Sequence, residues 1–151
     1  MNGTREITLL GQNVNQYGMD TGDIPFHRLL EFAAEVPGIE RIGFLTSHPA
    51  DFPVEILKVI RDHSNVSRSI HLPLQTGSDR VLSMMNRRYT FSDYMAIVEA
   101  ARSILESCAI STDLIVGFPG ETTGDFEKTL NAVETIRYDD AFTYAYSPRS
   151  G

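Results

Sequence analysis

Five short runs of mainly apolar residues recur along this 151-residue chain, and each ends abruptly in glycine, proline or polar residues. A segment with helical periodicity separates each run from the next. Regular alternation of this kind predicts parallel strands joined by right-handed helical crossovers. The predicted strands span residues 6–10, 41–46, 69–74, 111–116 and 141–146.

Capping residues and apolar periodicity locate the helices between these strands. Pro25 and Pro53 suit the first turn of a helix, and a short helical piece is predicted at 79–85. Thr90 and Thr122 each precede an aspartate by three residues, which is capping-box spacing. The residues predicted to face inward are Phe26, Leu29, Leu30 and Ala33; Ile56, Leu57 and Ile60; Tyr94, Ile97, Val98, Ala101 and Leu105; and Phe126, Leu130, Val133 and Ile136.

The predicted fold is α/β, with an open parallel five-stranded β/α sheet that is a fragment of a partial (β/α)6 TIM-like barrel. Five strands are too few to close a barrel, and the chain begins near one strand and ends just after another. We expect one incomplete domain over residues 1–151, since a chain of this length can bury a single core. Its two exposed sheet edges favour pairing with a second copy.

Charge and cysteine content narrow the class of protein. A formal net charge of −7 disfavours a protein that binds nucleic acid over its whole surface, although a local basic patch remains compatible with it. Cys108 is the single cysteine, so no internal disulfide forms, which suits a reducing compartment. No stretch has the length of a membrane span. We expect a soluble cytoplasmic protein with no membrane contact, in which Cys108 is a buried, unreactive thiol.

Polar residues collect where the predicted strands end. The GQN, SHP and QTGS sequences at 11–13, 47–49 and 75–78 offer amides, hydroxyls and an imidazole, and an arginine pair follows at 87–88. The GFPG turn at 117–120 lets a ligand approach the main chain. Each motif alone is equally compatible with a surface turn or a solvated charge pair. Together they predict a rim suited to a zwitterionic, nucleotide-like ligand, without indicating a reaction.

Two other interpretations remain open from the residues alone. One is a metal-dependent hydrolase or aldolase that uses His48, His71 and Asp113, although the chain has no paired-histidine motif and no cysteine pair. His71 lies within an apolar run, where a hydrogen-bonded interior histidine is the simpler interpretation. The other is a cofactor-binding or scaffold domain without catalysis.

Six motifs in order resemble the central part of the radical S-adenosylmethionine methylthiotransferases. They are LGQNVN (10–15), TSHP (46–49), HLPLQTGSD (71–79), MNRRYT (85–90), DLIVGFPGET (113–122) and YSPRSG (146–151). The GQN and SHP motifs are similar to those of the branch that modifies dimethylallyl-adenosine beside the tRNA anticodon. The branches that modify a ribosomal protein or threonylcarbamoyl-adenosine in tRNA are the alternatives.

The resemblance implies a tRNA substrate and two cofactors, S-adenosylmethionine and 4Fe-4S clusters. In such enzymes one cluster is held by a C-x-x-x-C-x-x-C loop, and electron transfer cleaves S-adenosylmethionine to a radical that starts methylthiolation. The residues implied to bind this cofactor are Asn13 near the methionine amino group; Ser47, Ser78 and Arg87 toward the sugar or carboxylate; and Ile115, Gly117 and Tyr146 around the adenine.

The chain departs from that family in lacking the cluster cysteines, since it begins after the place where their loop is expected. The N-terminal and C-terminal flanking domains of the family are also missing. Cys108 alone cannot ligate a cluster that needs several thiolates. We therefore predict that no catalytic residue or metal ligand lies in this chain and that the polypeptide alone is inactive.

Reconstitution with iron and sulfide tests this prediction. We expect the purified chain to bind less than one cluster per molecule, because a single thiolate cannot hold four irons. The measurement is the absorbance spectrum together with iron and sulfide analysis after desalting. A stoichiometric four-iron signal would contradict the prediction.

Overall fold

The computed structural model describes residues 3–19, 21–45 and 47–148, and it confirms an α/β fold with parallel strands. Thr46 and the motif residues 149–151 lie outside the described residues. Each strand begins within three residues of the start expected from its apolar run. The strands are β1 (Glu6–Leu9), β2 (Arg41–Phe44), β3 (Ser69–His71), β4 (Ala109–Val116) and β5 (Asp140–Ala145).

The helices follow the predicted order, and both capping boxes form as expected at Thr90 and Thr122. Two short 3-10 helices, η1 and η2, are additional to the prediction. None of the described helices is long and apolar enough to cross a lipid bilayer. The elements are η1 (Val14–Gln16), α1 (Phe26–Ala34), η2 (Pro49–Asp51), α2 (Val54–Asp62), α3 (Asp79–Met84), α4 (Phe91–Ile104) and α5 (Thr123–Ile136).

The expected five-stranded sheet is present as two adjoining sheets, β1-β2 and β3-β4-β5. They meet at one bridge between Ile42 and Val66, where the Ile42 amide donates to Asn65 and the Ile42 carbonyl accepts from Ser67. Thus β2 pairs with the segment that precedes β3 rather than with β3 itself. The third strand is also shorter than predicted, because Pro73 has no amide hydrogen for a ladder.

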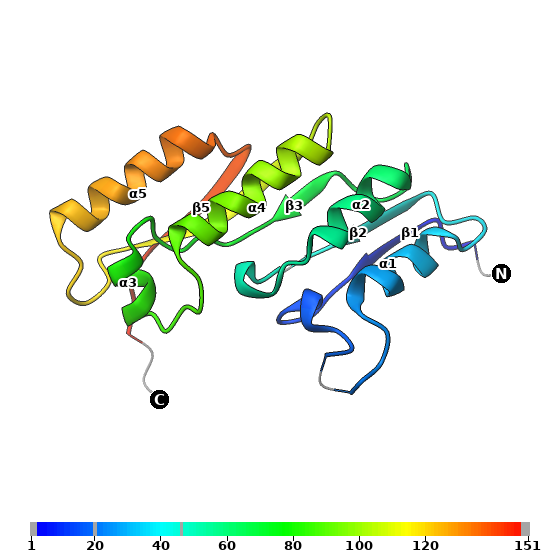
Figure 1. The fold of residues 1–151 in the computed structure, drawn as a ribbon, viewed down its shortest axis with the longest axis horizontal. Helices are drawn as coiled ribbons and strands as arrows, with labels where there is room; N and C mark the ends of the chain where they lie inside the picture. Colours follow the sequence, from blue (N-terminus) through cyan, green and yellow to red (C-terminus); the bar gives the residue numbers. More distant parts are fainter. Residues whose placement is uncertain (1–2, 20, 46, 149–151) are drawn as a thin grey trace.

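The helices α1, α2, α4 and α5 cover one side of the strands, and the loops after the strands lie at the lower left of the view (Figure 1). Ile56, Leu57 and Ile60 of α2 are fully buried, as predicted. In α4, Tyr94 and Val98 are buried too, and the Tyr94 hydroxyl donates to the Leu72 carbonyl at 2.8 Å. Apolar burial therefore fixes which side of each strand carries the helices.

The buried side of α5 differs from the prediction. Ile136 is buried as predicted, but Phe126 and Leu130 are 38% and 47% exposed. The other buried positions of the helix are Asp125, Thr129 and Ala132. The cause is a polar contact: the Gly77 amide donates to the Thr129 hydroxyl at 3.0 Å, and a Cβ on Gly77 would lie 2.4 Å from the Lys128 carbonyl oxygen. This close approach of the two backbones turns the side of α5 that carries Asp125 and Thr129 inward.

Truncation of two apolar residues of α5 tests this orientation. Ile136→Ala should lower the free energy of unfolding by about 2–5 kcal/mol, because it leaves a cavity in the core. Leu130→Ala should cost less than about 1 kcal/mol, because the side chain is already half-exposed. Urea denaturation of both variants measures the difference, and equal costs would contradict the orientation described here.

Candidate functional site

The parallel strands all end toward one edge of the molecule (Figure 1), and most of the predicted site residues follow these strand ends in the sequence. Along this rim the residues separate into two groups. The first contains Asn13, Ser47 and Arg87, which follow β1, β2 and α3. The second contains Ile115, Gly117 and Tyr146, at the ends of β4 and β5. Ser78 lies apart from both groups in the interior.

The loops of the first group are held together by side-chain amides. Asn15 is buried, its Nδ2 donates to the His48 carbonyl at 2.9 Å, and its Oδ1 accepts from the His48 amide at 3.2 Å. Asn13 Nδ2 donates to Asp51 Oδ2 at 3.2 Å, and Arg88 reaches the same oxygen at 3.4 Å. Three chain segments distant in sequence therefore share one polar cluster.

The imidazole of His48 is part of this cluster. Its Nδ1 accepts from the Ala50 amide at 3.3 Å, and its ring packs edge-on against Tyr89 with centroids 5.6 Å apart. Burial, followed by repulsion from Arg87, lowers the pKa of His48, although Asp51 opposes the shift. The histidine is therefore uncharged at neutral pH and acts as a hydrogen-bonding residue.

Tyr89 connects the two groups. Its hydroxyl contacts the carbonyl oxygens of Pro73 and Leu74 at 3.2 and 3.0 Å, at the end of the third predicted strand. Burial raises the pKa of Tyr89 to about 12, so the hydroxyl remains a donor. The segment that carries Arg87 is thereby fixed to the sheet of the second group while its arginines face the first.

Three of the predicted residues hold a buried polar atom that has no hydrogen-bond partner among the described residues. These atoms are Asn13 Oδ1, Ser47 Oγ and Arg87 Nε. Leaving such a group unpaired costs about 1–3 kcal/mol. His27 Nδ1 and Glu121 Oε1 share this property elsewhere. An acceptor, a hydroxyl and a cationic donor left unpaired on neighbouring loops are what a zwitterionic ligand can satisfy.

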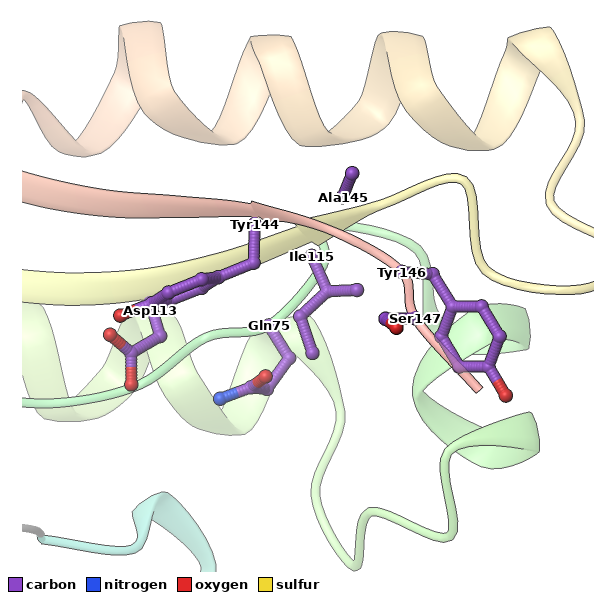
Figure 2. Close-up of a pocket in the computed structure, with 7 residues that line it drawn as sticks. All are labelled: Gln75, Asp113, Ile115, Tyr144, Ala145, Tyr146 and Ser147. Atoms are coloured by element: carbon purple, nitrogen blue, oxygen red, sulfur yellow. The ribbon is translucent and has the colours of Figure 1, made fainter. Parts of the chain in front are cut away.

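The second group borders a cavity of about 760 Å³, a size that suits a nucleoside-containing ligand. Ile115 and Tyr146, two of the residues implied to surround the adenine, are among its lining residues. Gln75, Asp113, Ile115 and Tyr144 project from the side of the strands opposite to α5, whereas Ala145 points toward that helix (Figure 2). The lining residues are Gln75, Asp113, Ile115, Tyr144, Ala145, Tyr146 and Ser147.

The glycine turn closes on its own carboxylate. Gly117 has a φ of +74°, which only glycine adopts without strain. Its amide and that of Phe118 both donate to Glu121 Oε2. The Phe118 ring packs against Tyr146 with centroids 5.1 Å apart, so the turn positions one wall of the cavity. The Gly117 amide itself is therefore engaged within the turn.

Ser78 is completely buried, and its hydroxyl donates to Asp125 Oδ1 at 2.6 Å. Asp125 also accepts from Arg80 and from both the amide and the hydroxyl of Thr122. The prediction that Ser78 faces a cofactor is not tested by this arrangement, in which its hydroxyl serves the start of α5. Sequence reasoning found Asp125 as a cap but missed that it also joins α3 to α5.

On the open face of β3 and β4, His71 contacts Ser111 Oγ at 3.0 Å and Asp113 Oδ2 at 3.3 Å. His71 is thus a partly buried, hydrogen-bonded histidine that pairs with the Asp113 carboxylate. His48 lies in the other cluster, and no three histidine, cysteine, aspartate or glutamate side chains of the described residues converge as a metal site. The geometry gives no support to a hydrolase that combines His48 with His71 and Asp113.

Comparison with known proteins connects this geometry to a family. The model of the Radical SAM superfamily matches residues 1–133. The chain belongs to the radical SAM superfamily. Two solved structures share its fold. Coproporphyrinogen III oxidase from Escherichia coli has a TM-score of 0.62 and 22% sequence identity, and the match covers 80% of this chain and 27% of the oxidase. Methylornithine synthase has a TM-score of 0.63 and 16% sequence identity, and the match covers 99% of this chain and 41% of the synthase.

The curated relatives are more similar in sequence. The tRNA-2-methylthio-N(6)-dimethylallyladenosine synthase of Caldicellulosiruptor saccharolyticus is 52% identical over 99% of this chain. The protein of the same name from Thermoanaerobacter pseudethanolicus is 51% identical over 99%. This radical SAM chain spans about a third of their length, 32% in both cases.

Replacement of Asp125 tests the connection between α3 and α5. Hydrogen bonds from Arg80, then from Ser78 and Thr122, hold the pKa of Asp125 well below its usual range. Because the folded-state pKa lies below the unfolded value of about 3.9, this stabilisation is present above that pH and is lost as the pH falls. Asp125→Asn should unfold more easily at pH 7 and show a shallower loss of stability below about pH 4.

The measurement is urea denaturation between pH 7 and the lowest pH at which the protein folds. Glu127→Gln removes one exposed carboxylate from the same helix and is the matched control. Parallel stability curves for the wild type and Asp125→Asn would show that the carboxylate does not stabilise this connection.

Proposed function

We propose that this chain is the central, incomplete part of the catalytic domain of a tRNA methylthiotransferase, which adds a methylthio group to dimethylallyl-adenosine beside the anticodon. The observation that carries the proposal is about 50% identity over nearly the whole chain to synthases named for that product. Membership of the radical SAM superfamily supports the reaction class. The methylthiotransferase activity belongs to the complete protein.

The rim residues fit S-adenosylmethionine. The amino-acid part of this cofactor carries an ammonium and a carboxylate, and the unpaired Asn13 Oδ1 and Arg87 Nε are an acceptor and a cationic donor for them. The Ser47 hydroxyl offers a further hydrogen bond. Ile115 and Tyr146 offer apolar contact in the cavity for an adenine ring. The positive φ at position 117 favours glycine, so no side chain covers the backbone there.

The residues of this chain do not fit a 4Fe-4S cluster, because Cys108 is the single cysteine. Cys108 precedes β4, at the edge of the sheet opposite to the rim, and burial raises the pKa of its thiol to about 11. It is therefore a protonated thiol at neutral pH rather than a ligand. Cluster-bound S-adenosylmethionine is a source of radicals in this superfamily, and ligation of the cluster falls to residues outside this chain.

The proposal places RNA binding mainly outside this chain. A net charge of −7 provides little general attraction for phosphate, and the arginines at 87–88 form the basic patch beside the site. A tRNA-modifying role also implies a cytoplasmic location. The outer strand β5 is exposed along its whole length, which supports self-association of the isolated chain through its edge.

Analysis of tRNA nucleosides tests the proposed function. Deleting the gene that encodes this sequence should replace 2-methylthio-dimethylallyladenosine by dimethylallyl-adenosine in digested tRNA, as measured by liquid chromatography and mass spectrometry. The intact gene should restore the modified nucleoside. Arg87→Leu should reduce restoration roughly tenfold or more, because it removes a charge-assisted hydrogen bond.

Arg61→Leu is the control, since Arg61 is an exposed residue of α2 that pairs with neighbouring Asp62. It should restore the nucleoside fully. Loss of a methylthio group from threonylcarbamoyl-adenosine or from a ribosomal protein instead would assign the chain to another branch. An unchanged nucleoside profile and no such loss would contradict the proposal.

A further inference from the structure

Asp51, in η2, connects three segments of the rim through one oxygen atom. Its Oδ2 accepts from Gln16 Nε2 at 2.7 Å, from Asn13 Nδ2 at 3.2 Å and from Arg88 at 3.4 Å. The side chain of Asp51 is 16% exposed. A carboxylate in this position is shielded from water and accepts hydrogen bonds from two other segments of the chain.

This contact fixes the orientation of the Asn13 amide. An ionised carboxylate only accepts hydrogen bonds, so it must face the NH2 group of Asn13 rather than its carbonyl. The carbonyl oxygen Oδ1 then points away from Asp51, and it is buried without a partner among the described residues. With the opposite orientation, two acceptors would face each other at 3.2 Å, which is unfavourable.

The other polar groups around Asp51 favour the same orientation of the Asn13 amide. His48 Nδ1 lies 3.8 Å from Asp51 Oδ2, but it accepts a hydrogen bond from the Ala50 amide and so carries no proton to donate. The charge of Arg87 also lowers the pKa of His48. Asp51 therefore receives its hydrogen bonds from Arg88 and from the side-chain amides of Asn13 and Gln16. His48 has no proton on Nδ1 with which to replace Asn13 as a donor.

We propose that Asp51 is a positioning residue that holds the Asn13 carbonyl toward the ligand, so that the rim selects a ligand with a hydrogen-bond donor at that point. This inference rests on the proposed function, in which the donor is the ammonium group of S-adenosylmethionine. Arg87 Nε, the unpaired donor of the same group, suits the carboxylate of the same amino acid. Asp51 itself need not touch the cofactor.

Calorimetric titration of the purified protein tests the inference with two ligands. One is S-adenosylmethionine, and the other is its analogue that lacks the amino group. The wild type should prefer S-adenosylmethionine by roughly tenfold or more, because the analogue leaves a buried acceptor unpaired. In Asp51→Asn the side chain at 51 can also donate, so the Asn13 amide is free to rotate and the preference should fall toward one.

A reversed pair provides the decisive control. In the double variant Asp51→Asn with Asn13→Asp, the new amide at 51 donates to the new carboxylate at 13, whose second oxygen again faces the ligand. The preference should return in this variant, which a purely structural role of Asp51 would not produce. Asp62→Asn removes an exposed carboxylate from the neighbouring helix α2 and should leave the preference unchanged.

Failure of the inference is distinguishable from failure of the proposed function. If the wild type binds neither ligand, the cofactor assignment is overturned, and this inference falls with it. If the wild type binds both ligands equally, or Asp51→Asn keeps the wild-type preference, only the role of Asp51 is overturned. Should Asp51→Asn fail to fold by circular dichroism, Asn13→Asp alone compared with the double variant decides, and equal preferences would overturn the inference.

Discussion

Burial of apolar side chains between the strands and the helices on one side of them is the interaction on which the rest of the structure depends. In β4 it takes Ile110 and Leu114 toward the helices and leaves Asp113 and Ile115 on the open face. A one-residue shift of register would reverse every one of these positions. The polar open face and the cavity beside Tyr146 follow from the packing of the other face.

Sequence periodicity predicts the elements of this fold well because apolar burial dominates them. The inward positions of α2 and α4, such as Ile60 and Tyr94, follow from spacing alone. It fails for α5, where the approach of Gly77 to Thr129 decides which side is buried. That contact joins residues 52 positions apart, and a pattern confined to one helix carries no information about it.

The position of the candidate site in the fold could be predicted from the sequence, but its internal contacts could not. Parallel strands bring their ends to one edge, so the rim residues could be found from motifs at strand ends. The hydrogen-bond partners of these residues could not be predicted in this way. Asp51 lies in a 3-10 helix that no periodicity signals, and it reaches Asn13 across 38 residues. Glu121 similarly turns back onto Gly117, so the amide of a turn expected to admit a ligand to the main chain is already hydrogen-bonded.

The junction between the two sheets divides the rim. Among the described residues, the two sheets are joined in their backbone pairing only by the bridge between Ile42 and Val66. Asn13 follows a strand on one side of this junction, and Ile115 lies on the other. An adenosyl amino acid bound by both groups would span this junction and link the two sheets. Its binding energy would then oppose sliding of the two sheets, and the protein with ligand should be mechanically stiffer than the protein alone.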